Sequence, residues 1–259
     1  MDINGEGVQS VSRALDLLKL VALSNREGAR LQDLVNASGL SKPTVHRLLK
    51  QLIASGMLMQ NSGRVYHLGA GAFELGIAAT KSFPLRDLAA PILEYLSQET
   101  GDSIFLVIRS GPDSLCIDRK LGSYPVKVLT VEPGHRQPMG IGAGGLAMLS
   151  FLQEDEQETA LRAIEPRLGQ YPGLTVKKLR KLMAETRERG WARATDMAVP
   201  GVTGVGLPLF DVRGQPFAAV SVGAISLRMN DAKVSHAVSL LRTQIRILTE
   251  TLLNTGARP

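Results

Sequence analysis

The chain has 259 residues, 44% of them apolar and 21% charged, which is close to ordinary globular usage and excludes fibrous and disordered classes. This length allows one large domain or two small ones. Basic residues exceed acidic residues by six charges, which permits an acidic partner such as nucleic acid without requiring one. The single cysteine, Cys116, excludes a disulfide framework and any multi-cysteine metal site, as suits a reducing cytoplasm.

Membrane and export signals are weak in this sequence. The longest weakly polar stretch, residues 139–152, is too short to span a bilayer. The first residues lack the basic and then apolar layout of a signal peptide. We therefore expect a cytoplasmic protein with no membrane partner.

The first 56 residues predict three helices. Apolar residues recur at spacings of three and four over residues 8–23, and a short second helix has Leu34 on its inner face. Gly39 then stands where a left-handed residue ends a helix. A third helix is expected to start at Ser41 with a capping hydroxyl, with Pro43 in its first turn.

The third helix carries a clean apolar stripe, and a hairpin follows it. The stripe consists of Val45, Leu48, Leu49 and Leu52. Residues 57–60 and 64–68 read as two strands around the turn Asn61-Ser62-Gly63. Two short helices joined through a glycine and followed by a hairpin describe a winged helix-turn-helix.

Basic residues on the outer face of the third helix point to DNA. From Arg30 to His67 there are five basic residues and one acidic residue, so positive charge is concentrated on this segment. Such side chains can reach phosphates and base edges from a helix in the major groove, and a wing can touch the backbone or minor groove. The candidate DNA-binding residues are Ser41, Lys42, Pro43, Thr44, Arg47, Lys50 and Arg64. The alternative for each is a solvated helix face.

Beyond a linker helix over residues 69–81 the pattern becomes mixed. A helix at 85–100 is followed by strand-like runs at SIFLVIR, SLCIDR and VKVLTVE. Helices are expected near residues 145–152, 154–164, 176–190 and 231–253, and strands at GVGLPLFD and FAAVSVGAIS. Since helices and strands do not alternate strictly, the second domain is predicted to be α+β with a largely antiparallel sheet.

Enzymatic signals are few. Gly140, Gly142 and Gly145 match the glycine spacing of a dinucleotide-binding fingerprint. However, no strand precedes them directly and no βαβ unit surrounds them. There is no G-x-S-x-G elbow, and Cys116 lies in an apolar run where a buried structural thiol is the default. The four histidines are scattered without metal-ligand spacing. We therefore expect no catalytic residues, no metal and no cofactor.

Two groups of segments resemble the IclR family of bacterial transcriptional regulators. In the first half they are LVNASGLSKPTVHRLLKQLIASGMLMQ and YHLGAGAFELG. In the second half they are PVKVLTVEPGHRQPMGIGAGGLAML and GWARATDMAVPGVTGVGLPLFDVRGQPFAAVSV. The resemblance covers nearly the whole chain, and both halves match in the right order. It implies a winged helix-turn-helix, a linker helix and a GAF/profilin-like effector-binding domain for a small organic acid.

The resemblance also implies an effector site. The acid group is expected at backbone amides where the glycine-rich loop opens a helix. The matching positions are Ala143, Gly144, Asp196, Val202, Gly204, Ser221 and Gly223. This sequence departs from the family at two of them: Gly204 stands where some members have Cys, and Gly223 where some have Ser. In the loop, Gly140, Gly142 and Leu146 replace more polar family residues. A roomier, less polar pocket for an aromatic or hydrophobic carboxylate is the hypothesis.

The interpretation is a ligand-responsive regulator, expected to act as a repressor, that binds double-stranded DNA at a near-palindromic operator. Residues 8–68 would form the DNA-binding domain, 69–83 the linker helix and 84–255 the effector-binding domain. The resemblance implies a homodimer through the DNA-binding half, or a homotetramer. The alternatives are an enzyme acting on a small organic acid and an interaction adaptor that does not bind DNA.

Overall fold

A computed structural model gives the fold, and it describes residues 6–24, 27–80 and 83–255. Contacts divide the chain into residues 1–82 and 83–259, here called the N-terminal and C-terminal units. Residues 81 and 82, where the expected linker helix ends, lie outside the described residues.

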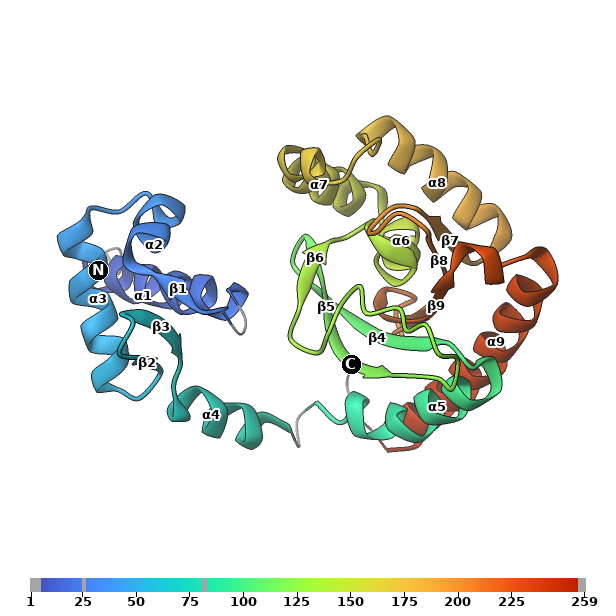
Figure 1. The fold of residues 1–259 in the computed structure, drawn as a ribbon, viewed down its shortest axis with the longest axis horizontal. Coiled ribbons are helices and arrows are strands. Elements are labelled where there is room, and N and C mark those ends of the chain that lie inside the picture. The colour runs from blue at the N-terminus through green and yellow to red at the C-terminus, as the bar shows by residue number, and fades with distance from the viewer. Residues whose placement is uncertain (1–5, 25–26, 81–82, 256–259) are drawn as a thin grey trace. The chain divides into compact units, whose positions relative to one another are not determined.

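The N-terminal unit packs three helices against a small antiparallel sheet (Figure 1). Its elements are α1 (Glu6–Leu23), β1 (Ala29–Arg30), α2 (Leu31–Ser38), α3 (Lys42–Ala54), β2 (Leu58–Gln60), β3 (Val65–Leu68) and α4 (Ala70–Thr80). The sheet order is β1-β3-β2. The predicted winged helix-turn-helix is confirmed, because α3 buries its expected stripe and Gly39 ends α2 at φ 66°.

The C-terminal unit is built on a six-stranded antiparallel sheet of order β6-β5-β4-β9-β8-β7. Its strands are β4 (Ser103–Ser110), β5 (Asp113–Lys120), β6 (Arg136–Pro138), β7 (Ala192–Thr195), β8 (Val202–Phe210) and β9 (Pro216–Ile225). Its α-helices are α5 (Leu85–Thr100), α6 (Gly142–Phe151), α7 (Glu154–Ile164), α8 (Val176–Arg189) and α9 (Asp231–Asn254). Two short 3₁₀ helices, η2 (Glu165–Gln170) and η3 (Ser226–Arg228), complete it. The predicted α+β class with an antiparallel sheet is confirmed.

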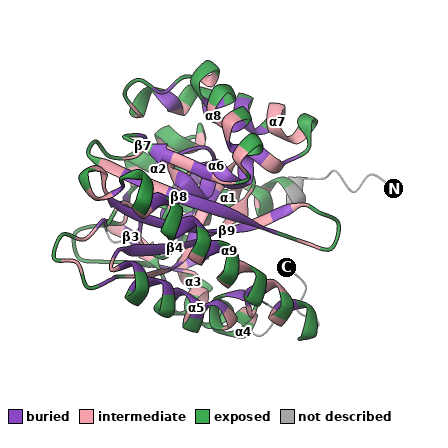
Figure 2. Ribbon diagram, turned by 90° about the vertical axis from the view of Figure 1, so that its right-hand side faces the viewer, coloured by how far each residue is buried: buried purple, intermediate pink, exposed green. Residues whose placement is uncertain are grey.

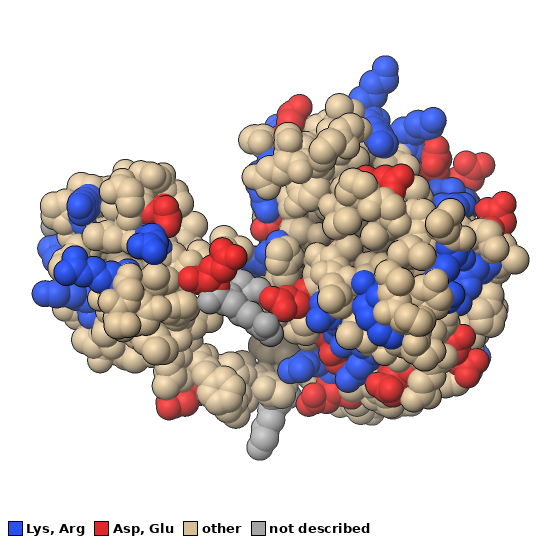
Figure 3. All heavy atoms as spheres, viewed as in Figure 1, with Lys and Arg blue, Asp and Glu red and all other residues tan. Residues whose placement is uncertain are grey.

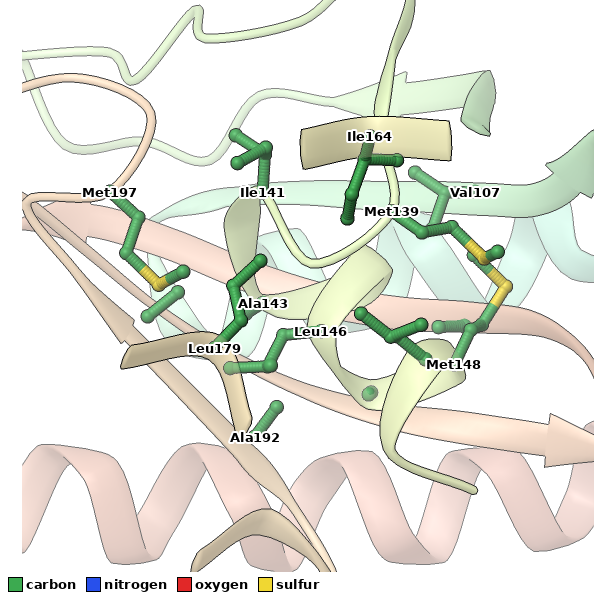
Figure 4. Packing of buried hydrophobic residues seen from close by; sticks show 14 of the residues in the cluster. Val107, Met139, Ile141, Ala143, Leu146, Met148, Ile164, Leu179, Ala192 and Met197 are labelled. Carbon is green, nitrogen blue, oxygen red and sulfur yellow. The ribbon is translucent and has the colours of Figure 1, made fainter. Parts of the chain in front are cut away.

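Both faces of this sheet are covered, and Figure 2 shows β8 and β9 buried along much of their length. Side chains of a strand alternate between the two faces. Leu106, Val205 and Val220 point toward the face covered by α5 and α9. Phe105, Val107 and Ala219 belong to the opposite cluster around α6. Figure 4 shows Leu146 of α6 beside Leu179 of α8 in that cluster.

The face under α6 carries unusually small residues. Gly204 pairs with Gly223, and Gly206 pairs with Ser221, across β8 and β9. A Cβ atom at Gly206 would lie 2.8 Å from the backbone carbon and oxygen of Ala143. The first turn of α6 therefore lies directly on the β8 backbone, and this contact positions the site described below.

Some expected elements were wrong in their details. The run VKVLTVE, residues 126–132, forms no strand, because it lies outside the sheet and has no partner strand. Helix α6 begins at Gly142, three residues before the expected start at 145, since its glycines can approach the sheet closely. The strands β6 and β7 were not predicted because each has at most four residues.

Substitution of Gly206 by Ala should destabilise the C-terminal unit. The added methyl group meets α6 backbone at 2.8 Å, which a rotamer change cannot relieve. We expect a loss of about 1–3 kcal/mol in the free energy of unfolding, measured by denaturant titration. Gly169→Ala is the matched control, since no atom lies within 4 Å of its Cβ position. Equal stability of the two variants would contradict the close contact.

Candidate functional site

The exposed side of α3 carries cations with no protein partner. Lys42, Arg47 and Lys50 are all exposed, and they make no ion pair or hydrogen bond within the described part of the chain. The buried stripe holds the opposite side of α3 against α1 and α2. These cations are therefore free to meet an acidic surface.

The start of α3 differs from the expected cap. The hydroxyl of Ser41 pairs with the hydroxyl of Thr44 at 2.8 Å and does not cap a backbone N–H group. The predicted capping hydrogen bond is thus wrong, because Thr44 offers a nearer side-chain partner. The first turn keeps unbonded N–H groups, which favour an anion such as a phosphate.

Arg64 lies at the turn of the β2–β3 hairpin. It is exposed, has φ 57°, and has no side-chain partner among the described residues. Asn61 fixes this turn by accepting hydrogen bonds from the N–H groups of Arg64 and Val65 at 3.0 Å each. Figure 3 shows basic side chains gathered on the side of the N-terminal unit where Figure 1 places α3.

A small pocket lies in the C-terminal unit between the α6 N-terminus, the sheet and the loop before β6, with a cavity volume of about 50 Å³. Six of the seven predicted effector residues line it: Ala143, Gly144, Val202, Gly204, Ser221 and Gly223. The seventh, Asp196, lies outside the lining. Its carboxylate accepts a hydrogen bond of 2.7 Å from the Gly201 N–H group and closes the turn between β7 and β8.

Other lining residues were not predicted, because register and loop packing bring them in from distant segments. They include Phe105, Val107, Val128, Thr130, Val131, Gln137, Ala194 and Met197. Gln137 lies close to the glycine-rich loop in the sequence. This closeness is the only sequence feature that could have indicated its place in the pocket. Its Nε2 donates to the Ile141 carbonyl oxygen at 2.9 Å, which orients the loop that leads into α6.

The pocket wall is apolar apart from hydroxyl and amide groups. Ser221 and Thr130 line it, and their hydroxyls have no hydrogen-bond partner among the described residues. No side chain caps α6 at Ile141. The N–H groups of Ala143 and Gly144 find no acceptor in the described chain, so they and the helix dipole offer a site for an anion.

The structure gives little support for a nucleotide-binding site or a metal site. Gly140 lies between antiparallel β6 and α6, and Gly142 and Gly145 lie within α6, so the surroundings are not those of a dinucleotide-binding βαβ unit. Within residues 6–24, 27–80 and 83–255, no group of His, Cys, Asp and Glu side chains is placed to hold a metal ion. The helices in these ranges are too short or too polar to cross a membrane.

Cys116 lies outside the pocket lining. Burial raises the pKa of its thiol to about 12, and the Sγ atom donates to the Asp118 carbonyl oxygen at 3.4 Å. A thiol with this pKa is protonated at neutral pH, and only the thiolate is a strong nucleophile. Cys116 is therefore a structural residue.

A winged helix-turn-helix with an unpaired basic face, followed in the same chain by an α+β unit with a small pocket, defines a class: DNA-binding regulators with a separate effector domain. The family model for the C-terminal domain of bacterial IclR transcriptional regulators matches residues 77–248, and the IclR helix-turn-helix model matches residues 10–62. The chain belongs to the IclR family. It is a transcriptional regulator and not an enzyme.

Named relatives and solved structures agree with this assignment. The regulator BhcR of Paracoccus denitrificans is 30% identical over 88% of this chain and 82% of that protein. The transcriptional repressor IclR of Escherichia coli is 29% identical over 88% and 84%. A crystal structure of an IclR-type regulator from Silicibacter has a TM-score of 0.82 at 26% identity, covering 94% and 96%. An IclR homologue from Microbacterium hydrocarbonoxydans, solved with 4-hydroxybenzoate, has a TM-score of 0.73 at 23% identity, covering 95% and 99%.

The raised pKa of Cys116 predicts slow labelling by iodoacetamide. Between pH 7 and the folded pKa of about 12, the native thiol stays protonated, so alkylation should be far slower than in the denatured chain. Raising the pH above about 8.5 ionises the thiol in the unfolded state only, so stability should fall with pH there. Mass spectrometry of native and urea-denatured protein measures the labelling. Equal rates in the two states would refute the buried neutral thiol.

Proposed function

We propose that this protein is a ligand-responsive repressor whose C-terminal pocket binds an aromatic or hydrophobic carboxylate. The single observation that carries the ligand class is the pocket itself. Its floor consists of Gly204 and Gly223, its wall is mostly apolar, and it opens onto the uncapped first turn of α6. We assign residues 8–68 to DNA binding, 69–83 to the linker and 84–255 to effector binding, in a protein of the cytoplasm.

The acid group of the ligand belongs at α6. The free N–H groups of Ala143 and Gly144 face an otherwise apolar wall, and helix N-termini bind anions through such groups. The lining contains no lysine, arginine or other cationic side chain. The helix therefore supplies the positive potential for a carboxylate, with the hydroxyl of Ser221 available as a further donor.

The rest of the ligand meets apolar side chains. Phe105, Met197 and Val202 line the pocket around the two floor glycines. Since Gly204 and Gly223 leave the floor without polar side chains, an apolar ligand suits this wall better than a small polar acid. The IclR homologue from Microbacterium hydrocarbonoxydans was solved with 4-hydroxybenzoate, which supports this ligand class for the shared fold.

The basic face of the N-terminal unit is assigned to double-stranded DNA. We place Arg47 and Lys50 of α3 in the major groove, with Ser41, Lys42, Pro43 and Thr44 at the leading turn and Arg64 on the wing. Relatives named as repressors support repression as the outcome. Ligand binding shifts the population of regulator between arrangements that bind DNA with different affinity.

We propose a homodimer, or a homotetramer built from dimers. Helix α4 exposes Phe73 at 70%, Leu75 at 59% and Ile77 at 57%, and it buries none of its residues. Such an apolar surface supports contact with a second copy of this chain. Two copies would place their α3 helices about 34–36 Å apart, or a multiple of that, on a near-palindromic operator.

Arg47→Ala should weaken binding to a DNA fragment from the region upstream of the protein's own gene. A base contact by arginine contributes about 1–3 kcal/mol of discrimination, so the loss should be largest on the specific site. Fluorescence anisotropy at several salt concentrations measures it. Lys181→Ala on α8 is the control, since its side chain is 78% exposed and lies outside the N-terminal unit. Absence of salt-dependent DNA binding by the wild type would favour the adaptor alternative.

The Gly223→Ala substitution should weaken the binding of aromatic acids. The added Cβ lies 3.1 Å from Cε2 of Phe105 and 3.5 Å from Cγ1 of Val128, so it takes up space that a ring needs. Calorimetric titration with 4-hydroxybenzoate should show an affinity loss of about tenfold or more, equivalent to about 1.4 kcal/mol. Gly169→Ala again serves as the control. Tight binding of small keto acids without binding of aromatic acids would contradict the proposed ligand class.

A further inference from the structure

The loop between β5 and β6, residues 121–135, forms one side of the pocket. Val128 and Thr130 of this loop line the cavity, while Val126 and Leu129 are 55% and 58% exposed. Val128 is only 5% exposed, and its Cγ1 lies 3.5 Å from a Cβ position at Gly223. The middle of the loop therefore reaches across the cavity to its floor.

The middle of this loop has no backbone support. Residues 125–130 make no backbone-to-backbone hydrogen bond with the described part of the chain. Segments with few backbone hydrogen bonds open at low free-energy cost. Val128, which belongs to the buried cluster around α6, is the contact that opening must break. We call residues 125–130 the cover.

The far end of the loop is fixed to β5. Arg119 donates from Nη1 to the Val131 carbonyl oxygen at 2.8 Å. The Cys116 N–H group donates to the His135 carbonyl oxygen at 3.0 Å, and the Gly134 N–H group donates to the Cys116 carbonyl oxygen at 2.8 Å. The cover therefore ends at an anchored segment.

The near end is fixed by close backbone contact with the start of β4. The Gly122 N–H group donates to the Asp102 carbonyl oxygen at 3.1 Å, and the Tyr124 N–H group donates to the Gly101 carbonyl oxygen at 2.9 Å. A Cβ at Gly122 would lie 2.1 Å from the Gly101 carbonyl carbon, so only glycine allows this approach. The backbone is thus hydrogen-bonded up to Tyr124, and beyond it the cover is tied back by its Lys127 side chain, whose Nζ donates to the Gly122 carbonyl oxygen.

A charged cluster, here called the clasp, holds Tyr124 by its side chain. The Arg228 guanidinium lies 3.6 Å from the centroid of the Tyr124 ring. Arg228 donates from Nε and Nη2 to the Asp102 carboxylate at 3.1 and 3.4 Å, and Lys233 Nζ lies 3.2 Å from the same carboxylate. The Asp102 side chain is 2% exposed, so the cation over the ring is held in a fixed place.

The cavity is too small for the ring we assign to it. Its volume is about 50 Å³, whereas a protein cavity that binds benzene has about 150 Å³. Helix α6 is held on the sheet by Leu146, Met148 and Leu149, each 0% exposed, so moving it away would expose buried apolar surface. The cover is the part of the wall without backbone hydrogen bonds, so a ring gains space where the cover moves.

We propose that residues 125–130 are a movable cover of the effector pocket, and that Asp102, Arg228 and Tyr124 form the clasp at which its near end turns. This inference rests on the proposed ligand class. Tyr124 and Arg228 do not line the pocket, so they are positioning residues. The clasp restrains opening, and its loss speeds ligand entry and release.

Hydrogen exchange of the full-length protein without ligand tests the cover. Tyr124→Ala removes the ring under Arg228, while Tyr124→Phe keeps the ring and serves as the matched control. The hydrogen-bonded amides at the near end, those of residues 122 and 124, should exchange about tenfold faster in Tyr124→Ala and at the wild-type rate in Tyr124→Phe, with α9 amides unchanged. Unchanged exchange of these amides in Tyr124→Ala would overturn the proposal. If Tyr124→Ala fails to fold, Arg228→Lys replaces it. This variant keeps a positive charge beside Asp102 but removes the guanidinium over the Tyr124 ring, so the same faster exchange is expected, and unchanged exchange would overturn the proposal.

Stopped-flow binding with 4-hydroxybenzoate as the probe tests the consequence. Association and dissociation rates should both rise several-fold in Tyr124→Ala and stay at wild-type values in Tyr124→Phe. Wild-type rates in Tyr124→Ala would overturn the role of the clasp. If the wild type does not bind 4-hydroxybenzoate or other aromatic acids, the proposed ligand class fails. The exchange experiment still decides whether the cover moves, so the two failures are distinguishable.

Discussion

The contact of the first turn of α6 with the β8 backbone is the constraint on which the C-terminal unit depends. Helices normally lie on a sheet through layers of side chains, but here Gly204 and Gly206 let the two backbones meet. Gly144 lets the same helix turn approach β4, since a Cβ there would lie 2.7 Å from Cγ2 of Val107. The helix gives up intrinsic stability through its glycines, and burial of Leu146, Met148 and Leu149 offsets this loss.

This contact also produces the pocket. The small residues that allow close approach at Gly206 continue along the same face to Gly204 and Gly223, which line the pocket beside the start of α6. The uncapped helix start then points at an apolar hollow instead of at solvent. The uncapped helix end and the side-chain-free floor of the pocket thus have one common cause, which is a row of small residues on one face of two neighbouring strands.

Several features followed from local sequence patterns alone. The α3 stripe, the left-handed Gly39 and the β2–β3 hairpin depend on interactions within a few residues, and all three are present in the structure. The strand expected at residues 126–132 failed for the opposite reason. Alternating Val, Leu and Thr side chains favour a strand, but a strand forms only beside a partner, and here tertiary packing lays the segment over the pocket.

The sequence by itself determined the winged helix-turn-helix, the basic face of α3 and the α+β class, because periodicity, capping and charge are local properties of the chain. The resemblance to a known family located six residues that line the pocket. Only the tertiary structure decided that Phe105, Val128, Gln137 and Met197 join them and that Asp196 closes a turn instead. It also brought Arg228 over Tyr124, across a hundred residues of chain. These contacts depend on strand register and on close backbone approach, which no local pattern encodes.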